Sequence, residues 1–259
     1  MVFAGLDLGL SSVKAVFLKG RRLIAHKTVF YEEDESELTA QRIMHLMLAE
    51  TGLNIDDIVS VVSTGVGRKE VSFARINRTE QLCCAKGAYH LYPSARAVLD
   101  TGAGGCRAMM LNEEGKLLDF SSNSKCAGGT GSFMEAAGGV LQLDLDVLDQ
   151  MALNASSTAH VTNYCAVFAE SEIISNIHRG FPLENICAGI CESVTQRMLD
   201  VLRRVETHKD VVLCGGVAKN RTVVKMFDSE LGFPVLVPEN PMIVGALGAA
   251  LIAETTVKG

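Results

Sequence analysis

Apolar residues form short runs over the first 30 positions of the chain. The runs Val2–Gly9, Val13–Leu18 and Leu23–Phe30 are separated by short polar or glycine-containing segments such as Gly20-Arg21-Arg22. Apolar runs of this length joined by tight turns are typical of β-strands that pair with their neighbours. The pattern therefore predicts a three-stranded antiparallel meander.

The apolar spacing changes after position 36. The following residues fall on one face of a helix: Leu38, Ile43, Met44, Met47 and Leu48. The acidic run 32–37 precedes them, and we interpret it as a solvated helix start, where negative charge is favourable. The next run, Ile58–Val62, predicts a buried strand.

A second series of elements begins near position 97. Ala97–Asp100 predicts a strand, and Arg107–Leu111 and Lys116–Phe120 flank the turn 112–115 as arms of a hairpin. We then expect helices at about 131–141, 145–153, 167–178 and 183–205, strands at 211–213 and 235–237, a helix from Lys219 and a last helix from Pro241 to about 254. The order strand, hairpin, helix occurs twice, which indicates two lobes.

Length and composition agree with this organisation. With 259 residues, of which 48% are hydrophobic, the chain is long enough for one large domain or two coupled small ones. We place lobe I at residues 1–96 and lobe II at 97–240, and expect the C-terminal helix 241–259 to pack back on lobe I.

The same features exclude several classes of protein. The longest apolar run, Met242–Ala253, is shorter than the roughly 20 residues that span a bilayer. Asp7 interrupts the apolar N-terminus and no basic segment precedes it, which argues against a signal peptide. A net charge of −6 and 5% aromatic residues argue against a nucleic-acid partner. We expect a cytoplasmic protein with neither a membrane nor a nucleic-acid partner.

The segment Gly5–Lys14 has the residues of a phosphate-binding loop between two strands. Gly9 lets backbone amides approach phosphate oxygens, Ser11 and Ser12 can donate further hydrogen bonds, and Lys14 adds positive charge. Asp7 is suited to hold Mg²⁺ through water.

Two later loops have similar chemistry. Asp100-Thr101-Gly102-Ala103-Gly104 repeats the Asp-x-Gly pattern after a strand, and 214–220 joins a strand to a helix through Gly215 and Gly216, ending at Asn220. One such loop alone is also explained as an ordinary turn. Two Asp-x-Gly loops, each followed by a hairpin, are much stronger evidence.

Together, the three loops resemble the phosphate-1, phosphate-2 and adenosine motifs of the actin/Hsp70/hexokinase (ASKHA) superfamily. The resemblance implies an α/β fold of two ribonuclease-H-like lobes around a nucleotide cleft that binds ATP or ADP with Mg²⁺. Asp7 and Asp100 would be the catalytic residues that hold Mg²⁺ and position water. The nucleotide-binding residues would be Gly9, Ser11, Ser12, Lys14, Gly102, Gly104, Gly215, Gly216 and Asn220.

Eight cysteines are many for a cytosolic chain of this size. A disulfide framework is improbable there, and buried thiols explain most of them, including Cys187 and Cys191. Cys126 and Cys165 differ because each lies at the start of an expected helix, where a thiolate is stabilised. A [4Fe–4S] cluster generally takes four thiolates, so two per chain would imply a dimer. From spacing alone, buried structural thiols remain the simpler explanation.

Four segments resemble the activators of 2-hydroxyacyl-CoA dehydratases, in the BadF/BadG/BcrA/BcrD ATPase family: Gly5–Gly9, Thr64–Arg68, Lys125–Gly131 with Phe133, and Cys165–Glu172. Double-cubane-cluster protein reductases belong to the same wider group. The resemblance implies a homodimer that bridges one [4Fe–4S] cluster through Cys126 and Cys165 of each chain. ATP hydrolysis would drive electrons from a ferredoxin or flavodoxin to an iron–sulfur dehydratase or reductase.

The chain departs from these activators in its second phosphate loop, where Gly102-Ala103-Gly104-Gly105 stands in place of Gly-Gly-Gln-Asp. This change indicates a divergent branch. The alternative interpretation is a sugar or amino-sugar kinase of the same superfamily without a cluster, and a nucleotide-gated scaffold of the actin kind is a third. Both leave the two cysteine motifs unexplained.

Overall fold

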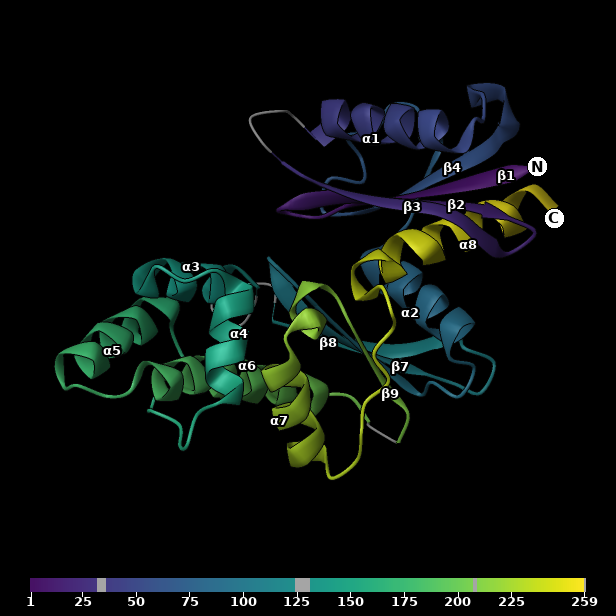
Figure 1. Ribbon diagram of the computed structural model, residues 1–259. Helices are drawn as coiled ribbons and strands as arrows, with labels where there is room; N and C mark the ends of the chain where they lie inside the picture. Colours follow the sequence, from purple (N-terminus) through teal and green to yellow (C-terminus); the bar gives the residue numbers. More distant parts are fainter. Residues whose placement is uncertain (32–35, 124–130, 207–208, 259) are drawn as a thin grey trace. The chain divides into compact units, whose positions relative to one another are not determined.

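The computed structural model describes residues 1–31, 36–123, 131–206 and 209–258 (Figure 1). The chain divides into two compact units. Unit 1 comprises Met1–Val98, Leu111–Leu118 and Pro238–Gly259, and unit 2 comprises Leu99–Met110 and Asp119–Val237. Among the described residues, no helix has both the length and the apolar character needed to cross a membrane.

Unit 1 contains a sheet with the strand order β3-β2-β1-β4-β5. Its strands are β1 (Val2–Leu8), β2 (Ser12–Lys19), β3 (Arg22–Phe30), β4 (Ile58–Gly65) and β5 (Ile76–Asn77). The antiparallel pairs β1–β2 and β2–β3 confirm the predicted meander. β4 pairs with β1 in parallel, so the ends of β1 and β4 lie side by side at Asp7 and Thr64.

Successive side chains of β1 point to opposite faces of this sheet, and both faces are buried. Val2, Ala4, Leu6 and Leu8 pack with residues of α1 (Ser36–Thr51). Phe3 points to the other face and packs with Ala249 and Ala253 of α8 (Val244–Lys258). Figure 1 shows α1 and α8 on opposite sides of the sheet. A strand buried on both faces accounts for the near-continuous apolar run in the sequence.

Small residues allow α8 to pack closely on α2 (Glu80–Leu91) and on β1. A Cβ atom added at Gly248 would lie 1.8 Å from the Cys83 carbonyl oxygen, and one added at Gly5 would lie 2.0 Å from the Ala246 carbonyl oxygen. The glycines therefore hold the backbones in contact. The sequence analysis did not predict α2, although Thr79 accepts a hydrogen bond from the Leu82 amide as its N-cap.

The second sheet has the strand order β8-β7-β6-β9. Its strands are β6 (Ala97–Gly102), β7 (Gly105–Leu111), β8 (Leu117–Ser122) and β9 (Val211–Cys214). The strand predicted at 235–237 is wrong, because only Leu236 forms a bridge, with Val212. The Leu236 amide donates to the Val211 carbonyl oxygen at 2.8 Å, and its own carbonyl oxygen accepts from the Leu213 amide at 3.0 Å. The neighbouring Val235 amide donates to the Asp228 carboxylate at 2.8 Å.

Helices make up most of unit 2. They are α3 (Gly131–Leu141), α4 (Leu145–Leu153), α5 (Ala166–His178), α6 (Leu183–Leu202) and α7 (Arg221–Leu231). α6 is largely buried and contacts α4, α5 and α7. Cys187 and Cys191 are fully buried on it, which confirms their interpretation as core residues.

Candidate functional site

Asp7 lies near the end of β1, half-buried and opposite Lys14 in the pair with β2. Two glycines leave room for its carboxylate. A Cβ atom at Gly65 would lie 2.7 Å from Asp7 Oδ1, and one at Gly245 would lie 3.0 Å from Oδ2. Backbone from three segments of unit 1 thus surrounds this carboxylate closely, so larger residues at either glycine would displace it.

The turn after β1 brings together the other phosphate-1 residues. The Gly9 amide donates to the Ser12 carbonyl oxygen at 3.0 Å, and Lys14 Nζ donates to the same oxygen at 3.3 Å. Ser11 is half-buried, and its carbonyl oxygen accepts from the Tyr31 amide. Ser12 Oγ is buried and has no hydrogen-bond partner within the described residues. A buried hydroxyl without a partner costs about 1–3 kcal/mol, so a bound oxygen ligand would relieve it.

A hollow of about 480 Å³ opens beside this turn in unit 1. It is lined by Gly9, Leu10, Tyr31, Ser36, Val66, Gly67 and Glu70. Burial is the main cause that raises the pKa of Tyr31, and the carboxylates of Glu70 and Asp7 act in the same direction. The phenol therefore stays protonated at neutral pH, and it lies beside two acidic groups.

Asp100 lies on β6 before the second glycine-containing turn. Arg107 Nη1 is 3.4 Å from Asp100 Oδ2, and the Cys214 thiol is 3.9 Å from Oδ1. Both side chains of the ion pair are largely buried. Gly102, the last residue of β6, and Gly104, in the loop that joins β6 to β7, are both half-buried. The sequence analysis missed Arg107, which neutralises Asp100 from the adjacent strand.

The third loop follows β9 in unit 2. Gly215 has a φ of +90°, and a Cβ atom there would lie 2.3 Å from the Thr101 carbonyl oxygen. This contact brings the third loop against β6, directly beside the second loop. Gly216 is exposed, and no atom of the described chain lies within 4 Å of a Cβ built on it. A side chain at Gly215 would thus meet Thr101, whereas the space beside Gly216 is open.

Asn220 has a structural role that the sequence analysis did not predict. Its Oδ1 accepts from the Val223 amide at 2.8 Å, which caps α7, and from the Cys191 thiol at 3.8 Å. This cap explains why α7 begins at Arg221 and not at Lys219 as predicted. The side-chain oxygen of this buried residue is thus occupied by the protein itself.

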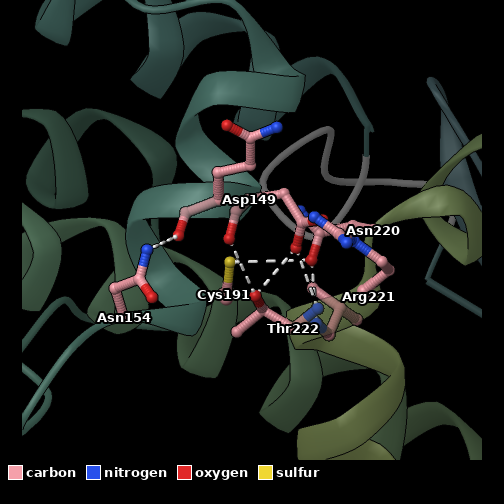
Figure 2. Close-up of polar contacts among 8 residues, drawn as sticks. Asp149, Asn154, Cys191, Asn220, Arg221 and Thr222 are labelled. Carbon is pink, nitrogen blue, oxygen red and sulfur yellow. Dashed lines mark hydrogen bonds and ion pairs between the residues drawn. The ribbon is translucent and has the colours of Figure 1, made fainter.

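Asp149, which lies on α4, also binds the first turn of α7. Figure 2 shows its carboxylate directed at the first residues of α7. Oδ1 accepts from the Thr222 amide at 2.9 Å and the Thr222 hydroxyl at 2.7 Å, while Oδ2 accepts from Arg221 at 2.9 Å. The sequence analysis missed this network, because no local pattern joins residues more than 70 positions apart.

Of the two predicted cluster cysteines, the structure describes Cys165 alone. Cys126 lies outside the described residues. Cys165 is half-buried at the N-cap of α5. Its neighbours Tyr164, Val167 and Phe168 are strongly exposed for apolar side chains. An accessible sulfur at the positive end of a helix fits a thiolate ligand of an anionic centre.

The other described cysteines are buried. Burial raises the pKa of Cys83 and Cys106 to about 12 and that of Cys187 to about 11, and it also raises the pKa of Cys191. These groups remain protonated thiols at neutral pH. Exposure therefore separates Cys165 from every other cysteine in the described ranges.

The structure gathers the predicted residues in two groups. Unit 1 holds Asp7, Gly9, Ser11, Ser12 and Lys14 at one strand end. Unit 2 holds Asp100, Gly102 and Gly104 next to the loop of Gly215 and Gly216, followed by Asn220. Their roles toward a nucleotide remain predictions.

Known proteins resemble the chain over almost its whole length. It is 40% identical to the activator of lactoyl-CoA dehydratase from Anaerotignum propionicum, over 98% of this chain and 97% of that protein. The structure of the activator of the 2-hydroxyisocaproyl-CoA dehydratase from Clostridium difficile with bound ADPNP matches with a TM-score of 0.94 and 34% identity. That match covers 100% of this chain and 96% of the other.

A more distant structure shares the fold. A ROK family glucokinase from Streptomyces griseus, in complex with glucose and AMPPNP, matches with a TM-score of 0.61 at 12% identity, over 98% of this chain and 100% of the other. At this identity the likeness shows the fold alone. The chain has the α/β fold of the actin/Hsp70/hexokinase type, as the three loops predicted. The model of the BadF/BadG/BcrA/BcrD ATPase family matches residues 4–253, and the chain therefore belongs to this family.

Proposed function

We propose that this protein is an ATP-dependent activator that delivers low-potential electrons to a partner iron–sulfur enzyme. The partner would be a 2-hydroxyacyl-CoA dehydratase or an enzyme of the double-cubane-cluster type. The observation that carries the proposal is the full-length similarity to dehydratase activators, combined with an accessible Cys165 at a helix N-terminus.

The nucleotide chemistry would come from the glycine-centred loops. Asp7 would hold Mg²⁺ and Asp100 would position water, while Gly9, Ser11, Ser12, Lys14, Gly102 and Gly104 would contact phosphates. The unpaired Ser12 hydroxyl supports this role. Gly215 and Gly216 would contact adenosine through the backbone, because the Asn220 side-chain oxygen already caps α7.

The redox chemistry would reside in one [4Fe–4S] cluster per homodimer. Cys126 and Cys165 of each chain would supply its four thiolates, and the described half of this donor set fits, as argued above for Cys165. The cluster would supply a one-electron carrier between a ferredoxin or flavodoxin and the partner enzyme. The residues of α5 would place the sulfur at an accessible, apolar surface.

Iron and sulfide content after anaerobic purification tests the proposal. We expect about four irons and four sulfides per dimer in the wild type. Cys126→Ala and Cys165→Ala should each lose the iron, whereas Cys187→Ala should keep it, because that thiol is buried in α6. A colourless monomeric wild type, or iron unchanged in Cys126→Ala, would refute the cluster assignment.

The kinase alternative rests on the fold alone. A kinase would be colourless and would consume ATP only in the presence of an acceptor. Measuring ATP hydrolysis without any sugar or amino sugar, alongside the iron analysis, separates the two functions.

A further inference from the structure

Several hydrogen bonds from helices α5 and α6 hold the segment that ends at Cys165. We call residues 159–165 the strap. The Ala159 amide donates to the Asn185 carbonyl oxygen at 2.9 Å, and Asn176 Nδ2 donates to the His160 carbonyl oxygen at 2.9 Å. The Thr162 amide donates to Glu172 Oε2 at 2.6 Å. Two side chains of α5 and a backbone carbonyl oxygen of α6 thus replace the regular partners that this irregular segment lacks.

Arg197 of α6 binds the part of the strap nearest to Cys165. Its Nη2 donates to the Thr162 carbonyl oxygen at 3.2 Å, and its Nε donates to the Asn163 carbonyl oxygen. The residue is only 6% exposed. The guanidinium is rigid and donates to two consecutive carbonyl oxygens. It therefore fixes both the position and the direction of the chain that enters α5.

The same guanidinium also contacts α3. Its central carbon lies 4.6 Å from the centroid of the Phe133 ring, which is 2% exposed. Phe133 is in the first turn of α3, and α3 follows directly after the segment that contains Cys126. A single buried cation therefore joins the start of α3 to the strap that leads to Cys165.

We infer that Arg197 is a positioning residue, which holds the Cys165 strap against α3 and places a buried positive charge at the carbonyl of Asn163, two residues before Cys165. The inference rests on the proposed function in naming the site as that of a cluster. The guanidinium would keep the Cys165 sulfur in a fixed direction. Its charge would favour the more reduced, more negative state of the centre, because water screens a buried cation only weakly.

Three variants of the full chain, purified anaerobically, test this role. Arg197→Met removes both the positive charge and the two hydrogen-bond donors. Arg197→Lys keeps the charge but loses the paired donors of the guanidinium. Ser193→Ala is the matched control. Ser193 Oγ donates at 2.9 Å to the same Thr162 carbonyl oxygen that Arg197 contacts, but it carries no charge. Each variant is compared with the wild type for iron release to a chelator, for midpoint potential and for thermal unfolding.

We expect Arg197→Met to release iron several-fold faster and to have a lower midpoint potential than the wild type. Arg197→Lys should keep a potential near that of the wild type while still releasing iron faster. Ser193→Ala should lose thermal stability without a change in potential. Wild-type iron release and potential in Arg197→Met would overturn the inference. If Arg197→Met does not fold, wild-type behaviour of Arg197→Lys in iron release overturns it.

A separate measurement distinguishes failure of the inference from failure of the proposed function. Wild type without iron would refute the proposed function alone. The alkylation rate of Cys165 in iron-free protein, followed by peptide mass spectrometry, then decides the positioning role. A several-fold change in the alkylation rate of Arg197→Met, without such a change in Ser193→Ala, supports the positioning role of Arg197. Equal alkylation rates in all proteins overturn it.

Discussion

The Asp149 carboxylate accepts hydrogen bonds from both the amide and the hydroxyl of Thr222, at the first turn of α7. Arg221 adds a third donor to the same carboxylate. α4 is thereby attached to the helix that follows the proposed adenosine loop. Because Asp149 is 6% exposed and Thr222 is 4% exposed, the two bonds between them are made away from water and contribute strongly.

Asp149→Asn should lower the free energy of unfolding at pH 7 by about 1–3 kcal/mol. Burial by itself would raise the pKa of Asp149, but hydrogen bonds from Thr222 and Arg221 outweigh it and lower the pKa below 3.8. The wild-type contribution is therefore complete above about pH 3.8 and is lost as the pH falls through the folded-state pKa. Urea unfolding from pH 7 to pH 3 should show the difference between the two proteins shrinking.

Arg221→Ala is the control for that experiment. The Arg221 side chain is 64% exposed, so solvent weakens its ion pair and the loss should stay below about 1 kcal/mol. A loss for Arg221→Ala equal to that for Asp149→Asn would contradict the dominant role of Thr222.

Ser12→Ala should weaken ATP binding without destabilising the nucleotide-free protein. The buried hydroxyl makes no hydrogen bond in the described part of the chain, so its removal leaves no new unpaired group. A hydrogen bond to a charged phosphate contributes about 1.5–3 kcal/mol, which corresponds to roughly a 10- to 150-fold change in affinity. Calorimetric titration and thermal unfolding measure both quantities. An unchanged affinity would remove Ser12 from the phosphate site.

Gly216→Ala should change ATP affinity, whereas Gly215→Ala should change stability. Gly216 has open space around it in the described structure, so alanine there should leave the thermal midpoint nearly unchanged but reduce ATP affinity. Gly215 has a φ of +90° and adjoins the Thr101 carbonyl oxygen, so alanine there should destabilise the nucleotide-free protein. Thermal unfolding with and without ATP separates the two. Wild-type ATP affinity of Gly216→Ala would argue against the adenosine assignment.

Gly248→Ala should destabilise unit 1 by about 1–3 kcal/mol or more, because the added methyl group would force α8 away from the Cys83 carbonyl oxygen. Gly139→Ala is the matched helical control. No described atom lies within 4 Å of a Cβ atom there, so alanine should stabilise α3 by about 0.5–1 kcal/mol. Chemical denaturation measures both. Equal stability of the two variants would mean that α8 can shift freely.

Alkylation at pH 8 should distinguish the cysteines of iron-free native protein. Cys165 is half-exposed and should react within minutes. Cys83, Cys106 and Cys187 should react only on unfolding, since burial excludes the reagent and raises the pKa of each thiol to about 11 or 12. Peptide mapping after a timed reaction identifies the modified residues. Rapid labelling of Cys106 would show that β7 opens readily.

The N-terminal elements and the site loops followed from local sequence. The near-continuous apolar run from Val2 to Leu8 predicts a strand by its length and the turn that follows it, before its partners on either face are known. The Asp-x-Gly loops were equally visible, because a glycine directly after a strand is a local signal for a turn whose backbone amides could face a phosphate. Family resemblance then extended these local features to the whole chain, and the family match confirmed it.

Only the tertiary structure showed which residues far apart in the sequence bind each other. The sequence contains Asn220 and Arg197, but it does not show that one caps α7 or that the other binds the Cys165 strap. The Val235 amide pairs with the Asp228 carboxylate, a partner that the local pattern at 235–237 does not indicate. Local periodicity is determined by neighbouring residues, whereas a buried donor takes whichever acceptor the folded chain brings within reach.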